Sequence, residues 1–141
     1  MPYNSETIRP LALALIKNEK NQILVSPGYD EVKQEPFYRL LGGGVEFGET
    51  SLEALHREFK EELNVELTNC RLLDVYENIF TFNNKPGHEI IFIYQADFVD
   101  LNNYQITEFQ ILDSSTDNKV IWLDKKAGDD QKIYPDISAW L

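Results

Sequence analysis

The residues best suited to chemistry are three glutamates, Glu58, Glu61 and Glu62, which are clustered within five positions of the chain. In a helix, side chains at i, i+3 and i+4 share one face, so these carboxylates would lie together and repel one another. A hard divalent cation with oxygen ligands would relieve that repulsion. A solvated acidic helix face is the alternative interpretation, because charged side chains mostly lie at the surface.

Two neighbouring features favour the metal site over the solvated face. Arg57 directly precedes the acidic cluster, and the glycine run 42–44 stands a short way before it. Glycines let a backbone approach a ligand closely, although the same run also suits a merely flexible turn. Together these residues are typical of a metal-assisted phosphate site. Glu46, between the two features, is either a neighbour of the ligands or a solvated residue.

A helix is needed to position the carboxylates, and the sequence predicts one that begins near residue 51. Thr50 and Glu53 form a T-x-x-E capping box, in which each side chain satisfies a backbone N–H of the first turn. Four apolar residues then recur at helical spacing and predict a stripe that faces the core. The stripe consists of Leu52, Leu55, Phe59 and Leu63.

The segment from Gly43 to Val65 resembles the Nudix box, G-x5-E-x7-R-E-U-x-E-E-x-G-U, where U is a bulky aliphatic residue. Every charged position of the box is present at its spacing. Two positions depart from it, since Asn64 replaces the usual Gly and Phe59 occupies a U position. Asn tolerates the left-handed conformation that ends a helix, so we expect a cost in stability and not a loss of chemistry.

The resemblance implies one Nudix hydrolase domain over residues 1–141, with an α/β fold. The expected architecture is an α/β/α sandwich that contains a mixed sheet and a strand–loop–helix catalytic box. It also implies Mg²⁺ or Mn²⁺ as cofactor, with a ligand set of Glu58, Glu61, Glu62 and the carbonyl of Gly42. Glu58 or Glu62 would lie nearest the attacking water. Arg57 would pair with Glu49 in a bidentate manner and hold the loop to the helix, although Glu49 alone also reads as an ordinary charge near a helix N-terminus.

The reaction implied by the resemblance is hydrolysis of a phosphoanhydride in a nucleoside diphosphate linked to another moiety. The alternative is a catalytically silent domain of the same fold that binds or senses a nucleotide. That alternative would be favoured if a box carboxylate had been replaced, and all of them are present.

Outside the box the candidates are less specific. Relatives often recruit one more acidic ligand, and Glu89 is preferred here over Glu108 and Asp117, with an exposed strand end as the alternative for Glu89. Sparse cations (Arg9, Arg39, Lys85) and strand aromatics (Tyr29, Phe37, Tyr76, Phe80, Phe82) could contact substrate, although strand aromatics more often belong to a core. Of these and the nearby histidine, we expect Arg39, Tyr76, Phe80 and His88 to bind the substrate. His88 could instead simply sit at a sheet edge.

Composition limits the class of partner. The chain has 141 residues, with 13 Lys and Arg against 24 Asp and Glu, for a net charge of −11. This balance argues against a nucleic-acid polymer or an anionic membrane as partner, but not against a small nucleotide bound with a cation. The lone Cys70 fits a cytoplasmic protein without an internal disulfide. We expect neither a signal peptide nor a membrane span, and a homodimer is possible.

The remaining elements follow from apolar runs and turn signals. The pattern predicts a hairpin of 8–17 with 23–25, a mobile loop over 26–36, strands at 37–41, 72–76, 79–82, 88–98 and 120–123, and a C-terminal helix over 134–141. In 88–98, Ile90 and its alternate neighbours give one wholly apolar face.

Overall fold

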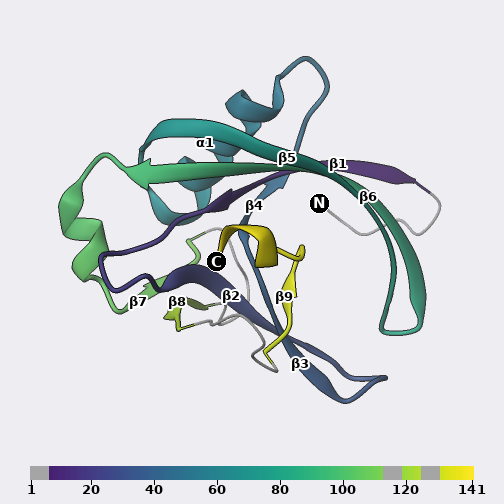
Figure 1. Cartoon of the computed structure of the whole chain (residues 1–141). Helices are drawn as coiled ribbons and strands as arrows, with labels where there is room; N and C mark the ends of the chain where they lie inside the picture. The colour runs from purple at the N-terminus through teal and green to yellow at the C-terminus, as the bar shows by residue number, and fades with distance from the viewer. Residues whose placement is uncertain (1–6, 113–118, 125–130) are drawn as a thin grey trace.

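The fold consists of one helix and two β-sheets, seen in a computed structural model that describes residues 7–112, 119–124 and 131–141 (Figure 1). The first sheet has the strand order β4-β1-β6-β5, and the second has the order β7-β8-β2-β3-β9. The first sheet is mixed, because β1 runs parallel to β6 and antiparallel to β4. Within the described residues, no helix has the length and apolar character needed to cross a bilayer.

The element bounds are as follows. The first sheet contains β1 (Ile8–Leu15), β4 (Leu41–Gly44), β5 (Leu67–Phe82) and β6 (Lys85–Phe98). The second contains β2 (Ile23–Asp30), β3 (Glu35–Arg39), β7 (Glu108–Gln110), β8 (Lys119–Leu123) and β9 (Ile133–Tyr134). The helix is α1 (Ser51–Leu63), and two short 3-10 turns cover Leu101–Gln105 and Ser138–Trp140.

The middle of the first sheet is buried on both faces, with α1 on one side and the second sheet on the other, whereas most of the edge strand β5 is exposed (Figure 1). Strand β1 shows how the sequence produces this layering. Ala12 and Ala14 face α1, where small side chains let the helix pack closely, whereas Leu11 and Leu13 fill the space between the sheets. The predicted alternation of β6 is confirmed, since Tyr94 and its alternate neighbours lie on the α1 side.

The box helix forms as the sequence predicts. Thr50 accepts from the backbone N–H of Glu53, and the Glu53 side chain accepts from the N–H of Thr50, so the capping box is complete. The helix ends at Asn64, whose φ of 54° lies in the left-handed region. Leu52 is the exception to the predicted apolar stripe, because it is 37% exposed.

The predicted hairpin between 8–17 and 23–25 was wrong. The two segments belong to different sheets and share only an isolated bridge between Lys17 and Ile23. The predicted loop over 26–36 was also wrong, because β2 continues to Asp30 and pairs there with β3. Strand β8 pairs with β2 only as far as Val25, so beyond that point one side of β2 has no strand partner among the described residues and accommodates Pro27.

The predicted C-terminal helix over 134–141 was wrong as well. Tyr134 ends β9, which pairs with β3, and only a 3-10 turn follows at Ser138–Trp140. Pro135 follows that strand directly, and Asp136 accepts hydrogen bonds from the backbone and hydroxyl of Ser138 in a tight local turn. The predicted α/β fold with a mixed sheet is confirmed, and among the described residues the second sheet covers the face of the first sheet opposite α1.

Candidate active site

Arg57 is the centre of the box region. Its Nε donates to Glu49 Oε2 at 3.1 Å and its Nη2 donates to Glu49 Oε1 at 2.6 Å, which gives the predicted bidentate pair. Nη2 also donates to the carbonyl of Gly44 at 2.9 Å. This hydrogen bonding to Glu49 raises the pKa of Arg57, and the same contact with Arg57 holds the pKa of Glu49 below its usual value. The guanidinium therefore ties the glycine strand and the following loop to α1.

The third guanidinium nitrogen contacts the acidic cluster. Nη1 of Arg57 donates to Glu58 at 3.0 Å and to Glu61 at 3.3 Å, and it lies 3.8 Å from a carboxylate oxygen of Glu46. These contacts offset the repulsion between the carboxylates. Glu62 lies one turn along the helix, half-buried, and its backbone carbonyl accepts from Leu112.

Gly42 and Gly43 of β4 lie so close to neighbouring atoms that a Cβ at either position would overlap with them. A Cβ added to Gly43 would lie 2.3 Å from the carboxylate carbon of Glu58. A Cβ added to Gly42 would lie 1.9 Å from the carbonyl oxygen of Ala12, and its φ of 147° is one that L side chains rarely adopt. The Glu58 carboxylate therefore packs directly on the backbone of the glycine strand.

The donor set of the box suits a divalent cation in its chemistry. Glu58, Glu61 and Glu62 offer only oxygen ligands, and they lie on one helix beside backbone carbonyls. Among the residues described, no three His, Cys, Asp or Glu side chains lie close enough together to hold a metal as they stand. The Glu61 side chain is 46% exposed, so it can rotate away from Arg57 and toward an ion.

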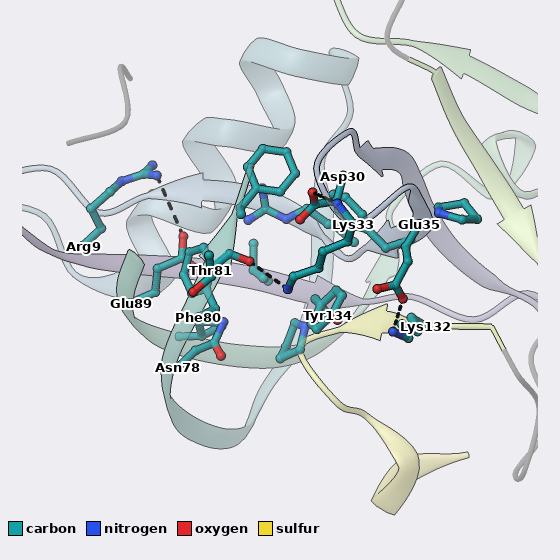
Figure 2. A pocket seen from close by; sticks show the side chains of 17 residues that line it. Arg9, Asp30, Lys33, Glu35, Asn78, Phe80, Thr81, Glu89, Lys132 and Tyr134 are labelled. Atoms are coloured by element: carbon teal, nitrogen blue, oxygen red, sulfur yellow. Dashed lines mark hydrogen bonds and ion pairs between the residues drawn. The ribbon is translucent and has the colours of Figure 1, made fainter. Parts of the chain in front are cut away.

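A pocket of about 280 Å³ lies between the two sheets (Figure 2). Its walls come from β1, β5 and β6 of the first sheet and from β2, β3 and β9 of the second. The lining includes residues from both sheets. Arg9, Asn78, Phe80 and Glu89 come from the first sheet, and Asp30, Phe37, Arg39 and Tyr134 come from the second.

The four predicted substrate residues do not lie together. Arg39 and Phe80 line the pocket, whereas Tyr76 and His88 do not. His88 lies on β6, an inner strand, so its placement at a sheet edge was wrong; it pairs with Ile8 on one side and with a β5 residue on the other. Tyr76 lies on β5 and is 37% exposed.

Glu89 lies in the pocket and not at the box. It is only 5% exposed, and its carboxylate lies 3.8 Å from Nη1 of Arg9. The register places it on the side of Ile91, the face of the sheet opposite α1 and Glu58. Its assignment as a metal ligand stays a prediction. Of the other candidates, Glu108 pairs with Lys119 on the second sheet, and Asp117 lies outside the described residues.

Sequence reasoning missed several pocket residues. Asn78 is the cross-strand partner of Glu89, and Tyr134 enters the pocket because β9 pairs with β3. No local pattern signals either position, since both depend on pairing between distant segments. Asp30 is buried for a structural reason: it accepts from three backbone N–H groups, the bond from Lys33 being the main cause of its lowered pKa.

Comparison with known proteins agrees with this geometry. A family model described as the NUDIX domain matches residues 7–136. The 8-oxo-dGTP diphosphatase of Proteus vulgaris is 30% identical over 70 residues, or 50% of this chain and 62% of that protein. The RNA pyrophosphohydrolase of Ruthia magnifica subsp. Calyptogena magnifica is 34% identical over 70 residues, or 50% of this chain and 37% of that protein. The matches thus span less than two thirds of either relative.

Solved structures show the same fold. The crystal structure of a MutT NUDIX hydrolase from Burkholderia pseudomallei matches with a TM-score of 0.61 and 24% identity, over 84% of each chain. The MutT protein from Methanosarcina mazei matches with a TM-score of 0.56 and 19% identity, over 86% of this chain and 80% of the other.

Proposed function

The chain belongs to the NUDIX family, and from this premise we propose that it is a divalent-cation-dependent hydrolase of phosphoanhydride bonds. Its substrate is a nucleoside diphosphate linked to another group, and its products are a nucleoside monophosphate and a phosphorylated remainder. The observation that carries the proposal is the cluster around Arg57, in which intact box carboxylates pack on the glycine strand.

The roles follow from where each group lies. Glu58, Glu61 and Glu62, with the carbonyl of Gly42, hold the cation, Mg²⁺ or Mn²⁺. When bound, the cation offsets the charge of the phosphate oxygens and acidifies a water. Glu58 or Glu62 positions that water and accepts its proton, as a carboxylate close to the reacting phosphorus can. Arg57 is a positioning residue, because all three of its nitrogens are already used by Glu49, Gly44 and the acidic cluster.

The substrate runs from the pocket to the box. Strand β3 lines the pocket as far as Arg39, and Leu40 connects it to the glycine strand β4. Gly42 stands three positions after Arg39, so the distance between their Cα atoms is at most about 11 Å. Arg39 is exposed, and its side chain makes no hydrogen bond or ion pair with another described residue. It is therefore placed to meet a phosphate between a nucleoside in the pocket and the bond cleaved at the box.

The substrate is a small nucleotide and not the end of a nucleic-acid polymer. One relative is named for RNA pyrophosphohydrolase activity and another for 8-oxo-dGTP. This chain carries a net charge of −11, which would repel the continuing phosphates of a polymer. The phosphate charge of a mononucleotide can be offset by the cation and the few arginines at the site alone.

The test is release of nucleotide or phosphate from a panel of nucleotide sugars, dinucleoside polyphosphates, ADP-ribose-type compounds and nucleoside triphosphates. Each compound is assayed with Mg²⁺, with Mn²⁺ and with EDTA. The proposal expects cation-dependent release from at least one member. If no member is cleaved and a nucleotide still raises the melting temperature, the chain is a nucleotide-binding domain instead.

A further inference from the structure

We propose that the pocket between the sheets reads the base of the nucleotide, and that Glu89 and Arg9 select a 2-amino-4-oxopyrimidine edge, the edge of guanine. This inference rests on the proposed function and deepens it by naming the base. It draws on the shape of the pocket and on the unused hydrogen-bonding capacity at one end of it.

The pocket is a slot between aromatic rings that lie over glycines. Phe80 pairs across strands with Gly87, and a Cβ on that glycine would lie 2.3 Å from the ring. Phe37 pairs with Gly28 in the other sheet, where the corresponding distance is 2.5 Å. Each ring thus lies flat against its own sheet and leaves space between the sheets. A planar ring system suits such a space, because aromatic faces stack on bases of any kind.

The two rings differ in their contacts with other aromatic side chains. Phe37 makes edge contacts with Phe82, at 5.7 Å between ring centroids, and with Tyr134, at 5.8 Å. Among the ring contacts of the described residues, none involves Phe80. Phe80 lines the pocket, so its ring can contact a ligand that enters there.

The Arg9–Glu89 pair forms one end of the pocket, and it is poorly satisfied (Figure 2). The separation of 3.8 Å between Nη1 of Arg9 and the carboxylate of Glu89 is too long for a hydrogen bond. Nε of Arg9 is buried and has no hydrogen-bond partner among the described residues. Buried polar groups are almost always hydrogen-bonded, so a pair that leaves this much capacity unused can gain hydrogen bonds from a ligand.

Apart from Arg39, which is assigned above to a substrate phosphate, the other charged groups of the pocket are already engaged. Glu35 pairs with Lys132 at the opposite end of the pocket (Figure 2). Lys33 donates to the backbone carbonyl of Thr81 at 3.1 Å, and Asp30 is saturated by backbone N–H groups. The Arg9–Glu89 end is thus the part of the pocket where the edge of a base can form the most new hydrogen bonds.

The arrangement of donors and acceptors selects the base. A carboxylate accepts two hydrogen bonds best from two adjacent donors, and guanine offers them as N1–H and the 2-amino group. The neighbouring O6 of guanine is an acceptor, which suits the guanidinium of Arg9. Adenine, cytosine and uracil each place an acceptor beside their ring-edge donor, so one carboxylate oxygen would face a lone pair. Pterins carry the same edge as guanine.

The experiment is calorimetric titration of the full chain with GMP, IMP and AMP in EDTA, so that no turnover is needed. We expect GMP to bind more tightly than IMP, which lacks the 2-amino group, by on the order of tenfold or more, and AMP to bind more weakly still. Equal affinity for the three nucleotides, or no binding of GMP, would overturn the proposal. The same titration with neopterin monophosphate, a pterin that carries the same edge, shows whether the site prefers a pterin or a guanine nucleotide.

Substitutions test which side chains cause the preference for GMP over IMP. Glu89→Gln should remove most of the difference between GMP and IMP, and Arg9→Met should weaken both. Glu77→Gln is the matched control, because Glu77 lies on the neighbouring strand, is exposed and does not line the pocket. A GMP preference that survives in Glu89→Gln would contradict the role of Glu89. The wild-type comparison of GMP with IMP decides the proposal even where a variant does not fold.

Hydrolysis and base selection can fail separately. Cation-dependent cleavage that ignores the base would overturn this inference and leave the proposed function standing. Selective binding of GMP without cleavage of any guanine nucleotide would do the reverse.

Discussion

The molecule contains two arginine–glutamate pairs of opposite character. At the box, Arg57 and Glu49 are joined by two hydrogen bonds of 2.6 and 3.1 Å, and the remaining donors of Arg57 reach Gly44 and the acidic cluster. In the pocket, Nη1 of Arg9 lies 3.8 Å from the Glu89 carboxylate, and no described residue offers a hydrogen-bond partner to the buried Nε of Arg9. One pair is saturated by the protein and the other is not.

This difference distinguishes a pair that holds the fold together from a pair that is suited to bind a ligand. A saturated guanidinium has no donor left for a ligand, so it holds elements in place. An unsaturated, largely buried pair contributes less to stability than a fully bonded one, and a ligand with the right edge can supply the missing bonds. The four predictions that follow test this contrast.

The largest effect is expected at the box carboxylates. Glu61→Gln and Glu62→Gln should each lower kcat by on the order of a hundredfold or more, because each removes a charged oxygen ligand from the cation site. Folding should be retained, since removing a like charge relieves repulsion on the helix. Steady-state kinetics at saturating cation measure the effect, with the exposed Glu66→Gln as control. Near-normal turnover in both variants would refute the assignment of the ligands.

Two glycines provide a matched pair of substitutions. Gly43→Ala pushes a methyl into the Glu58 carboxylate, and Gly87→Ala pushes one into the Phe80 ring. We expect the first to lower kcat by about a hundredfold through misplacement of a ligand, and the second to raise KM with kcat little changed. Kinetics of both variants on one substrate provide the comparison. The same kinetic change in both would mean that the two regions do not act separately.

Conservative replacement of each arginine should affect stability unequally. Arg57→Lys loses the bidentate geometry and should lower the free energy of unfolding by about 2 kcal/mol. Arg9→Lys removes no hydrogen bond within the described structure, so we expect a change within about 0.5 kcal/mol. Urea denaturation of the ligand-free variants measures both values. A larger loss in Arg9→Lys than in Arg57→Lys would reverse the contrast.

The smallest expected effect is the pH dependence of the Glu49 contribution. The pKa of Glu49 is lowered from 4.5 by its hydrogen bonds with Arg57, so its contribution to stability is complete above pH 4.5 and is lost as pH falls through the lower native value. The difference in unfolding free energy between wild type and Glu49→Gln should therefore be constant near pH 7 and shrink below pH 4.5. Thermal melts from pH 7 to pH 3 measure it. A difference that grows on acidification would show that the sign is wrong.

The box was predictable from sequence because its geometry is local. The cap at Thr50, the left-handed end at Asn64 and the pair of Arg57 with Glu49 all join residues that are close along the chain. Short-range spacing and a known motif were enough to place these contacts. The metal-binding and catalytic roles of these residues are proposals that rest on that placement.

The pocket was not predictable, because it depends on pairing between distant segments. Arg9 and Glu89 meet only because β1 and β6 pair in parallel, and Tyr134 arrives through β9. The segment 26–36 read as a loop because Pro27 and Gly28 are poor strand formers, yet Gly28 is what makes room for the Phe37 ring. Here tertiary pairing overrode local propensity.

The most direct test is to measure kcat and KM for wild type, Glu62→Gln and Glu89→Gln on the best substrate of the panel. The account predicts that Glu62→Gln lowers kcat with KM nearly unchanged, and that Glu89→Gln raises KM for a guanine nucleotide with kcat nearly unchanged. A loss of kcat in Glu89→Gln equal to that in Glu62→Gln would contradict the division between a box that cleaves and a pocket that selects.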